Sequence, residues 1–174
     1  MKRINIEIKA VCTDPDFVET YLHRMQAEFK GEDHQVDTYF KASSGRLKLR
    51  EGRIENALIR YHRPEKKGLK RSDVFLYRIT GETGHLRIIL EDTLGIDIVV
   101  EKRRKIYYIG NVKFHIDHVQ RLGCFVEIEA IDANGHLEEK ALKRQCRHYM
   151  TELGISEADL VAASYSDLIR HRDT

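Results

Sequence analysis

Apolar and polar side chains alternate strictly along residues 4–10, close to the start of the chain. A period of two residues is typical of a strand whose two faces meet different surroundings. The polar face of this strand carries Asn5, Glu7 and Lys9. Taken alone, the segment indicates an ordinary half-buried strand whose polar face meets water.

One-sided charge returns in four later segments. The polar residues that share a face in each segment are Arg46, Lys48 and Arg50, then Lys102 and Arg104, then Lys113, His115 and Asp117, and finally Glu127 and Glu129. A single strand with one charged face is readily explained by salt bridges in contact with water. Five such strands are harder to explain in this way. We therefore favour a barrel lined with charge over the solvated alternative.

The remaining hydrophobic patterns predict helices and further strands. Helical spacing of apolar residues predicts helices over 15–29, 84–94 and 136–153, with a short capped helix at 156–159. Strand patterns cover 35–42, 46–50, 57–63, 71–80, 96–109, 112–119 and 124–131. With the first strand this gives about eight strands, and no linker or repeat divides the expected single domain over residues 1–174.

Composition limits the classes of partner. Lysine and arginine number 30 against 28 aspartate and glutamate, so the net charge of +2 gives no reason to expect nucleic acid. No run approaches the roughly 18 apolar residues of a membrane helix, so we expect a cytoplasmic protein with no membrane partner. Cys12, Cys124 and Cys146 lie far apart in the sequence, which indicates reduced, packed thiols.

The charged faces carry both acids and bases. The acids are Glu7, Asp117, Glu127 and Glu129, and the bases are Lys9, Arg46, Lys48, Arg50, Arg63, Lys102 and Arg104. Burying so many charges is costly without partners, so a ligand is implied. Carboxylates suit Mg²⁺ or Mn²⁺, and arginine and lysine suit phosphate oxygens. Together the two groups predict a metal-bound polyphosphate, either a nucleotide or a plain polyphosphate.

These residues resemble the motifs of the CYTH superfamily of triphosphate tunnel enzymes over almost the whole chain. The superfamily signature Glu-x-Glu-x-Lys corresponds to residues 5–9, the basic strand to 46–50, and a Lys-x-Arg to 102–104. The acidic end corresponds to Asp117 with 127–129. Segments 35–40, 58–64, 122–127 and 164–168 resemble the branch called class IV adenylyl cyclase.

The resemblance implies an α+β fold built on an eight-stranded antiparallel tunnel with flanking helices, with Mg²⁺ or Mn²⁺ as cofactor. It assigns metal binding to Glu7, Glu127, Glu129 and Asp117, and catalysis to Asp117 and Lys9. The residues expected to bind the substrate phosphates are Lys9, Lys48, Arg50, Arg63, Lys102 and Arg104. Arg60 is held in reserve, because parity places Arg63 rather than Arg60 on the face of Tyr61.

The resemblance leaves three functions open for a small-molecule triphosphate ligand. The first is an adenylyl cyclase reaction that converts ATP into cyclic AMP and pyrophosphate. The second is hydrolysis of an inorganic or organic triphosphate, such as thiamine triphosphate, and the third is noncatalytic binding. Asn5 stands where the family has its first glutamate, which questions activity, and a homodimer is left open. His115 and His118, beside Asp117, are expected to pack or to serve as polar groups near the substrate, and Asp37 and Tyr39 receive no role.

Overall fold

The computed structural model describes residues 2–62, 67–132 and 135–173. Its strands are β1 (Lys2–Val11), β2 (Glu28–Phe40), β3 (Arg46–Glu51), β4 (Ala57–His62), β5 (Lys70–Arg78), β6 (Ile96–Ile109), β7 (Val112–Val119) and β8 (Gly123–Asp132). Its helices are α1 (Pro15–Arg24), α2 (Gly84–Leu94), α3 (Glu139–Glu152), the 3-10 helix η1 (Glu157–Asp159) and α4 (Tyr165–Asp173). None of the helices in these ranges combines the length and apolar character needed to cross a membrane.

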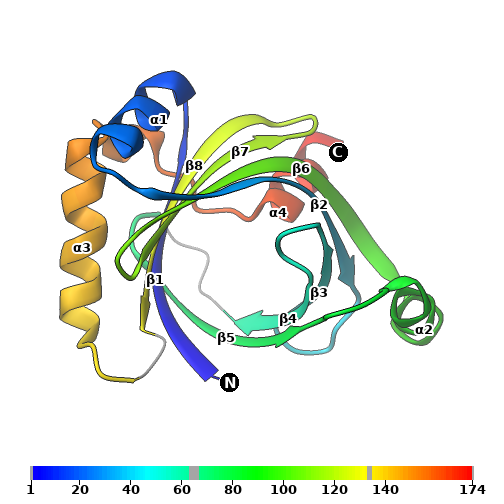
Figure 1. Cartoon of the computed structure of the whole chain (residues 1–174). Helices are drawn as coiled ribbons and strands as arrows, with labels where there is room; N and C mark the ends of the chain where they lie inside the picture. Colours follow the sequence, from blue (N-terminus) through cyan, green and yellow to red (C-terminus); the bar gives the residue numbers. More distant parts are fainter. Residues whose placement is uncertain (1, 63–66, 133–134, 174) are drawn as a thin grey trace.

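The strands close into a barrel in the order β1-β5-β4-β3-β2-β6-β7-β8. Every neighbouring pair is antiparallel. Figure 1 looks into the barrel, with α1 and α3 outside β1 on one side and α2 on the opposite side. The predicted fold class, an α+β fold on an eight-stranded antiparallel barrel with flanking helices, is confirmed.

The main hydrophobic core lies outside the barrel wall, between the outer face of β1, β7 and β8 and helices α1 and α3. Ile8, Phe114 and Ile128 from the strands and Leu22 and Leu142 from the helices are all almost fully buried there. Because successive side chains of a strand point to opposite faces, the polar residues of the same strands point into the barrel. Burial of the outer face therefore frees the interior for charged side chains.

Residues 161–167 cross one end of the barrel. The Nζ of Lys70 on β5 donates to the carbonyl oxygens of Val161 and Ala162 at 3.0 and 2.6 Å. On β3, Nη2 of Arg46 lies 2.7 Å from Oδ2 of Asp167. Arg46 was expected among the inward bases, but the structure uses its guanidinium to hold the start of α4.

The first helix is shorter than its hydrophobic pattern predicts. α1 ends at Arg24 rather than near residue 29, because Gln26 adopts a left-handed φ of 56° and the Ala27 amide bonds back to the Leu22 carbonyl. That geometry is typical of a helix C-terminus. Phe29, which continued the helical pattern, belongs to β2 and is 49% exposed, so β2 begins seven residues earlier than predicted.

Candidate active site in the barrel

The barrel encloses a cavity of about 790 Å³ that is lined by side chains from all eight strands. The predicted site residues that line it are Glu7, Lys9, Lys48, Arg50, Lys102, Arg104, Glu127 and Glu129. Arg63 lies outside the described residues. Arg60 is exposed, in agreement with the parity that placed its side chain on the other face of β4.

Asp37 binds three cationic side chains in the wall of this cavity. Its carboxylate lies 2.8 Å from Nζ of Lys48, 2.8 Å from Nε of Arg50 and 2.8 Å from Nζ of Lys102. Burial opposes ionisation of Asp37, but the three cations outweigh it and hold the pKa of the carboxyl well below its usual range. These four residues, here called the Asp37 cluster, carry a net positive charge, which favours an anionic ligand.

Lys102 is the most deeply buried base of the Asp37 cluster. Burial disfavours its ammonium form and, although Asp37 opposes the effect, lowers the pKa of Lys102 to about 7. The neighbouring charges of Arg50, Arg104 and Lys48 act in the same direction as burial. Lys102 therefore changes its charge near neutral pH, and an incoming anion would favour the protonated form.

A second group of charges surrounds Arg104 on β6. Its Nη2 donates to Oε2 of Glu127 at 2.8 Å, and its Nε donates to Oδ1 of Asp117 at 2.6 Å. Asp117 also accepts a hydrogen bond of 2.8 Å from the Tyr165 hydroxyl. Asp117 was predicted to bind metal or activate the nucleophile. Its fully buried carboxylate lies behind Arg104, outside the residues that line the cavity, in a position suited to orienting that guanidinium.

Glu127 connects Arg104 to two further residues. Its carboxylate lies 3.1 Å from Nδ1 of His115 and 3.4 Å from Nζ of Lys9. The Lys9 ammonium in turn lies 3.7 Å from the ring centroid of Tyr165, a cation–π contact. Burial, together with the positive charge of Arg104, lowers the pKa of His115 to about 4, so the imidazole is neutral at pH 7.

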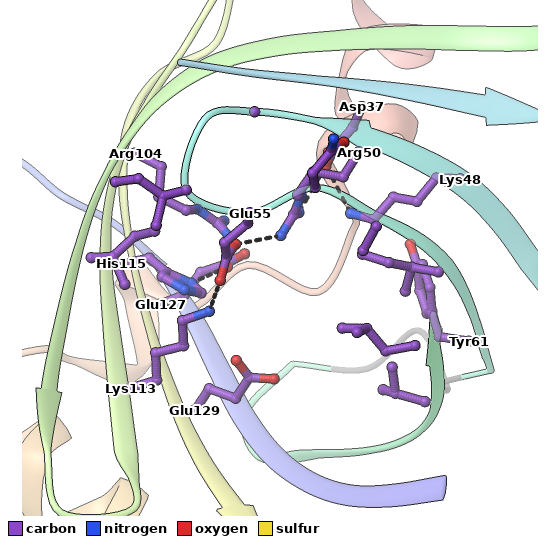
Figure 2. Close-up of a pocket in the computed structure, with 18 of the residues that line it drawn as sticks. Asp37, Lys48, Arg50, Glu55, Tyr61, Arg104, Lys113, His115, Glu127 and Glu129 are labelled. Atoms are coloured by element: carbon purple, nitrogen blue, oxygen red, sulfur yellow. Dashed lines mark hydrogen bonds and ion pairs between the residues drawn. The ribbon is translucent and has the colours of Figure 1, made fainter. Parts of the chain in front are cut away.

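The loop between β3 and β4 sends Glu55 into the barrel, where it bonds to Nζ of Lys113 and lies 3.0 Å from Nη1 of Arg50 (Figure 2). Asp33 fixes the loop by accepting hydrogen bonds from three successive backbone amides, at 2.7, 3.1 and 3.0 Å. A Cβ at Gly52 would lie 2.5 Å from the Asp33 carboxylate, so only glycine fits there. Glu55 is thus a built-in counter-anion for two cavity cations.

Carboxylates gather on the adjoining wall, where β1 meets β8. Glu7 and Glu129 are directly paired across these strands, and Nδ2 of Asn5 donates to Oε1 of Glu129. Burial and the neighbouring charges of Glu7, Glu127 and Glu55 raise the pKa of Glu129, although Lys113 opposes them. Oδ1 of Asn5 is buried, and no group among the described residues donates a hydrogen bond to it. The wall therefore combines excess negative charge with an unused carbonyl oxygen.

This wall fits a divalent cation that arrives with a substrate. Within the described ranges, no group of three or more histidine, cysteine, aspartate or glutamate side chains is arranged to hold a metal ion. Mg²⁺ usually needs only one or two protein carboxylates, with substrate phosphates and water completing its shell. Glu7 and Glu129, with Oδ1 of Asn5, can supply that protein share, whereas Glu127 is already bonded to Arg104.

The wall formed by β4 and β5, which adjoins the carboxylate wall at β1, is largely apolar. Ile59 and Tyr61 from β4 and Val74 and Leu76 from β5 line it. The Lys48 ammonium lies 5.8 Å from the ring centroid of Tyr61, at the border between the apolar and charged walls. A ligand with both an anionic and an organic part would find a matching surface for each.

Sequence reasoning missed or set aside several of the residues that shape the site. Asp37 lies on a strand for which no charged face was predicted. His115 was expected only to pack or to lie near the substrate, and Lys113, on the same charged face, was given no role. Glu55 lies in a turn and had no periodic signal at all. Tyr165 was part of the branch motif at 164–168, yet nothing in that motif placed its hydroxyl on Asp117.

Comparison with known proteins supports the architecture. A family model described as the CYTH domain matches residues 3–165. A protein from Vibrio parahaemolyticus proposed to be an adenylate cyclase has 18% identity and a TM-score of 0.76, over 97% of this chain and 98% of that one. A protein from Pyrococcus horikoshii has 22% identity and a TM-score of 0.73, over 94% and 98% of the two chains.

A Hippeastrum protein proposed to be an adenylyl cyclase, and described as having a dominant triphosphatase activity, has 13% identity and a TM-score of 0.58 over 98% of this chain and 95% of that one. Comparison with curated protein sequences finds no match. Because the family model covers nearly the whole chain and the closed barrel carries the expected charged interior, this protein belongs to the CYTH domain family.

Proposed function

We propose that the protein is a metal-dependent enzyme that binds an organic triphosphate inside the barrel and, with ATP as substrate, forms cyclic AMP and pyrophosphate. The observation that carries the proposal is the arrangement of one cavity with cations of the Asp37 cluster on one side, paired carboxylates on another and an apolar wall on β4 and β5 between them. Phosphates, a divalent cation and an organic group each have a complementary surface.

Phosphate binding is the role of the cationic side chains. Arg50 can offer two N–H groups to neighbouring oxygens, and Lys48 and Lys102 offer compact charges beside it. All three are now neutralised in part by Asp37, and Arg50 also by Glu55. An incoming phosphate group would take over from Glu55 as the partner of Arg50 and Lys113. Binding would therefore exchange a protein carboxylate for a ligand oxygen without exposing a bare buried charge.

Glu7, Glu129 and Oδ1 of Asn5 would hold Mg²⁺ or Mn²⁺, which when bound polarises a phosphoryl oxygen and lowers the pKa of a coordinated hydroxyl. The ribose 3′-hydroxyl attacks the α-phosphorus, the bond to the bridging oxygen breaks, and pyrophosphate leaves in line. The hydroxyl proton passes to solvent. Burial and the neighbouring carboxylates raise the pKa of Glu129 in the free protein, and a bound cation would relieve that repulsion. Lys9 and Arg104, oriented by Asp117, stabilise the negative charge on the transferred group.

Triphosphate hydrolysis is the second candidate. The same cations would bind the phosphates and the same carboxylates would hold the divalent cation, with water replacing the 3′-hydroxyl as the nucleophile. The Hippeastrum protein, whose fold is similar, is described as having a dominant triphosphatase activity. The apolar wall of β4 and β5 favours an organic triphosphate over inorganic tripolyphosphate in either reaction.

The test is a substrate screen with ATP, thiamine triphosphate and tripolyphosphate in the presence of Mg²⁺ or Mn²⁺, with the products separated by anion-exchange chromatography. We expect equal amounts of cyclic AMP and pyrophosphate from ATP. Phosphate release without cyclic AMP would replace the cyclase proposal by the triphosphatase one. Tight binding with no turnover of any substrate would overturn both and identify a noncatalytic binder.

A pair of variants controls the screen. Lys48→Met removes a cavity cation, and we expect weaker triphosphate binding and lower turnover. Lys140→Met makes the same change on an exposed face of α3 and should leave both unchanged.

A further inference from the structure

Two cysteines that are far apart in the sequence lie opposite one another at the seam between β1 and β8. The register of these antiparallel strands ends with Val11 opposite Phe125, so the next pair is Cys12 and Cys124. The backbone amide of Cys12 donates to the carbonyl oxygen of Cys124 at 3.0 Å. Directly opposed residues of antiparallel strands have Cα atoms about 4.5–5.5 Å apart and side chains on the same face. A disulfide requires Cα atoms about 4.4–6.8 Å apart.

The third cysteine has a different environment. Cys146 on α3 is fully buried in the main core, and its Sγ donates to the Ile6 carbonyl oxygen at 3.2 Å. All three thiols are free. Cys12 is 8% exposed and Cys124 is half-buried, so reagents can reach the pair from the Cys124 side.

The two thiols of the pair are also electronically distinct. A hydrogen bond from the Cys124 thiol is the main reason why the pKa of Cys12 is lowered, and burial opposes it. The same hydrogen bond and burial raise the pKa of Cys124. Because the thiolate is the reactive form of cysteine, Cys12 is the nucleophile of the pair and Cys124 its neighbouring resolving thiol.

We propose that Cys12 and Cys124 form a redox modification site that closes to a cross-strand disulfide when the protein meets a peroxide. The Cys12 thiolate attacks one peroxide oxygen, the O–O bond breaks, and a sulfenic acid forms with release of water after proton uptake. The Cys124 sulfur then attacks the Cys12 sulfur, its proton and the sulfenic hydroxyl leave as a second water molecule, and the S–S bond forms. Two thiols are oxidised by two electrons, and one peroxide is reduced to two water molecules.

The cysteine pair lies at the ends of two strands that also line the cavity. The proposed redox site does not depend on the function proposed for the cavity. Cys12 directly follows the last residue of β1 and lies three residues after Lys9, and Cys124 lies on β8 three residues before Glu127. A disulfide there covalently joins the two strands that carry the Lys9–Glu127 ion pair. Since the strands are already in register, the link fixes the existing seam instead of requiring a rearrangement.

Oxidation of the folded protein with hydrogen peroxide tests the proposal. The remaining thiols are alkylated with N-ethylmaleimide after denaturation, and intact mass is combined with peptide mapping. We expect the loss of two hydrogen atoms, a cross-linked peptide containing Cys12 and Cys124, and alkylation of Cys146 alone. Reduction with dithiothreitol should restore three alkylated thiols. The mapping uses the natural chain, so it does not depend on whether any variant folds.

Variants provide the matched controls. Cys146→Ser should still lose two hydrogen atoms, whereas Cys12→Ser and Cys124→Ser should not. The oxidised natural protein should also unfold at a higher temperature than the reduced one, because the link constrains the unfolded chain. A disulfide that involves Cys146, a link between two molecules, or peroxide treatment that leaves three alkylatable thiols would overturn the proposal. A sulfinic acid on either member of the pair without any disulfide would also overturn it.

Discussion

The carboxylate of Asp37 lies 2.8 Å from the ammonium nitrogen of Lys102, and the two residues are 1% and 2% exposed. The same carboxylate also binds Lys48 and Arg50, so one acid holds three bases that come from β3 and β6. Its role is structural and electrostatic at once. Asp37 permits the bases to be buried, and it leaves them a surplus of positive charge for a ligand.

Asp37→Asn should destabilise the fold and make its stability depend more strongly on a bound anion. Three buried cations would lose their main counter-charge, so we expect the free energy of unfolding to fall by about 3–5 kcal/mol, as for broken buried ion pairs. Urea denaturation measures the change. Asp92→Asn, at an exposed position of α2, is the control and should have little effect. Tripolyphosphate should raise the melting temperature of Asp37→Asn more than that of the natural protein; an equal shift would contradict this role.

Lys102 should make triphosphate binding dependent on pH. Its pKa is about 7 in the free protein, and a bound anion would raise it. At pH 7 binding should therefore take up protons, and the affinity should fall as the pH rises above 7, because the free protein then holds Lys102 in the neutral form. Calorimetry in buffers of different ionisation enthalpy measures the uptake. Lys102→Arg keeps its charge throughout this range, and an unchanged uptake in that variant would assign the proton to another group.

Glu55→Gln should strengthen triphosphate binding. The substitution keeps the size of the side chain but removes the charge that competes for Lys113 and Arg50. Loss of one charge-assisted competitor predicts a dissociation constant for tripolyphosphate that is lower by roughly tenfold. Glu82→Gln, at an exposed position, provides the comparison. Weaker binding by Glu55→Gln would instead mean that Glu55 holds the two cations in the geometry that the ligand needs.

Asn5→Glu should tighten the binding of Mn²⁺. The substitution adds a carboxylate beside Glu7 and Glu129, and affinity for hard cations rises with ligand charge, here by about tenfold. Electron paramagnetic resonance measures free Mn²⁺ without requiring turnover. Asn5→Gln keeps a neutral amide and should show no gain. If both variants bind Mn²⁺ like the natural protein, the carboxylate wall is not the cation site.

His115 should contribute a loss of stability in mild acid. Its pKa is about 4 in the folded protein, below the ordinary value of 6.5, so the unfolded state binds the proton more readily between these values. Stability therefore falls as the pH drops from 6.5 to 4, by up to about 1.4 kcal/mol per pH unit. Urea denaturation across this range measures the slope. His115→Asn should flatten it and the exposed His85→Asn should not; identical slopes in all three proteins would remove His115 as the cause.

Local pattern was sufficient to predict the charged face of five strands, β1, β3, β6, β7 and β8. The period of two depends only on the backbone of the strand itself, so Glu7, Lys9, Lys48, Arg50 and the later pairs could be placed on inward faces before any pairing was known. Helical spacing of apolar residues, which is also a local pattern, predicted both ends of α2. It failed at the end of α1, because a single left-handed residue, Gln26, stops a helix that the apolar spacing would have continued.

The contacts between side chains of different strands could be identified only from the tertiary structure. Asp37 meets Lys102 across the β2–β6 region, Glu55 reaches Lys113 from a loop without any periodic signal, and Cys12 meets Cys124 at the far end of a long-range register. The sequence by itself determined that the strands have charged inner faces and that the chain resembles a triphosphate tunnel. Only the folded barrel decided which charges neutralise one another, because register and closure bring together residues that no local pattern connects.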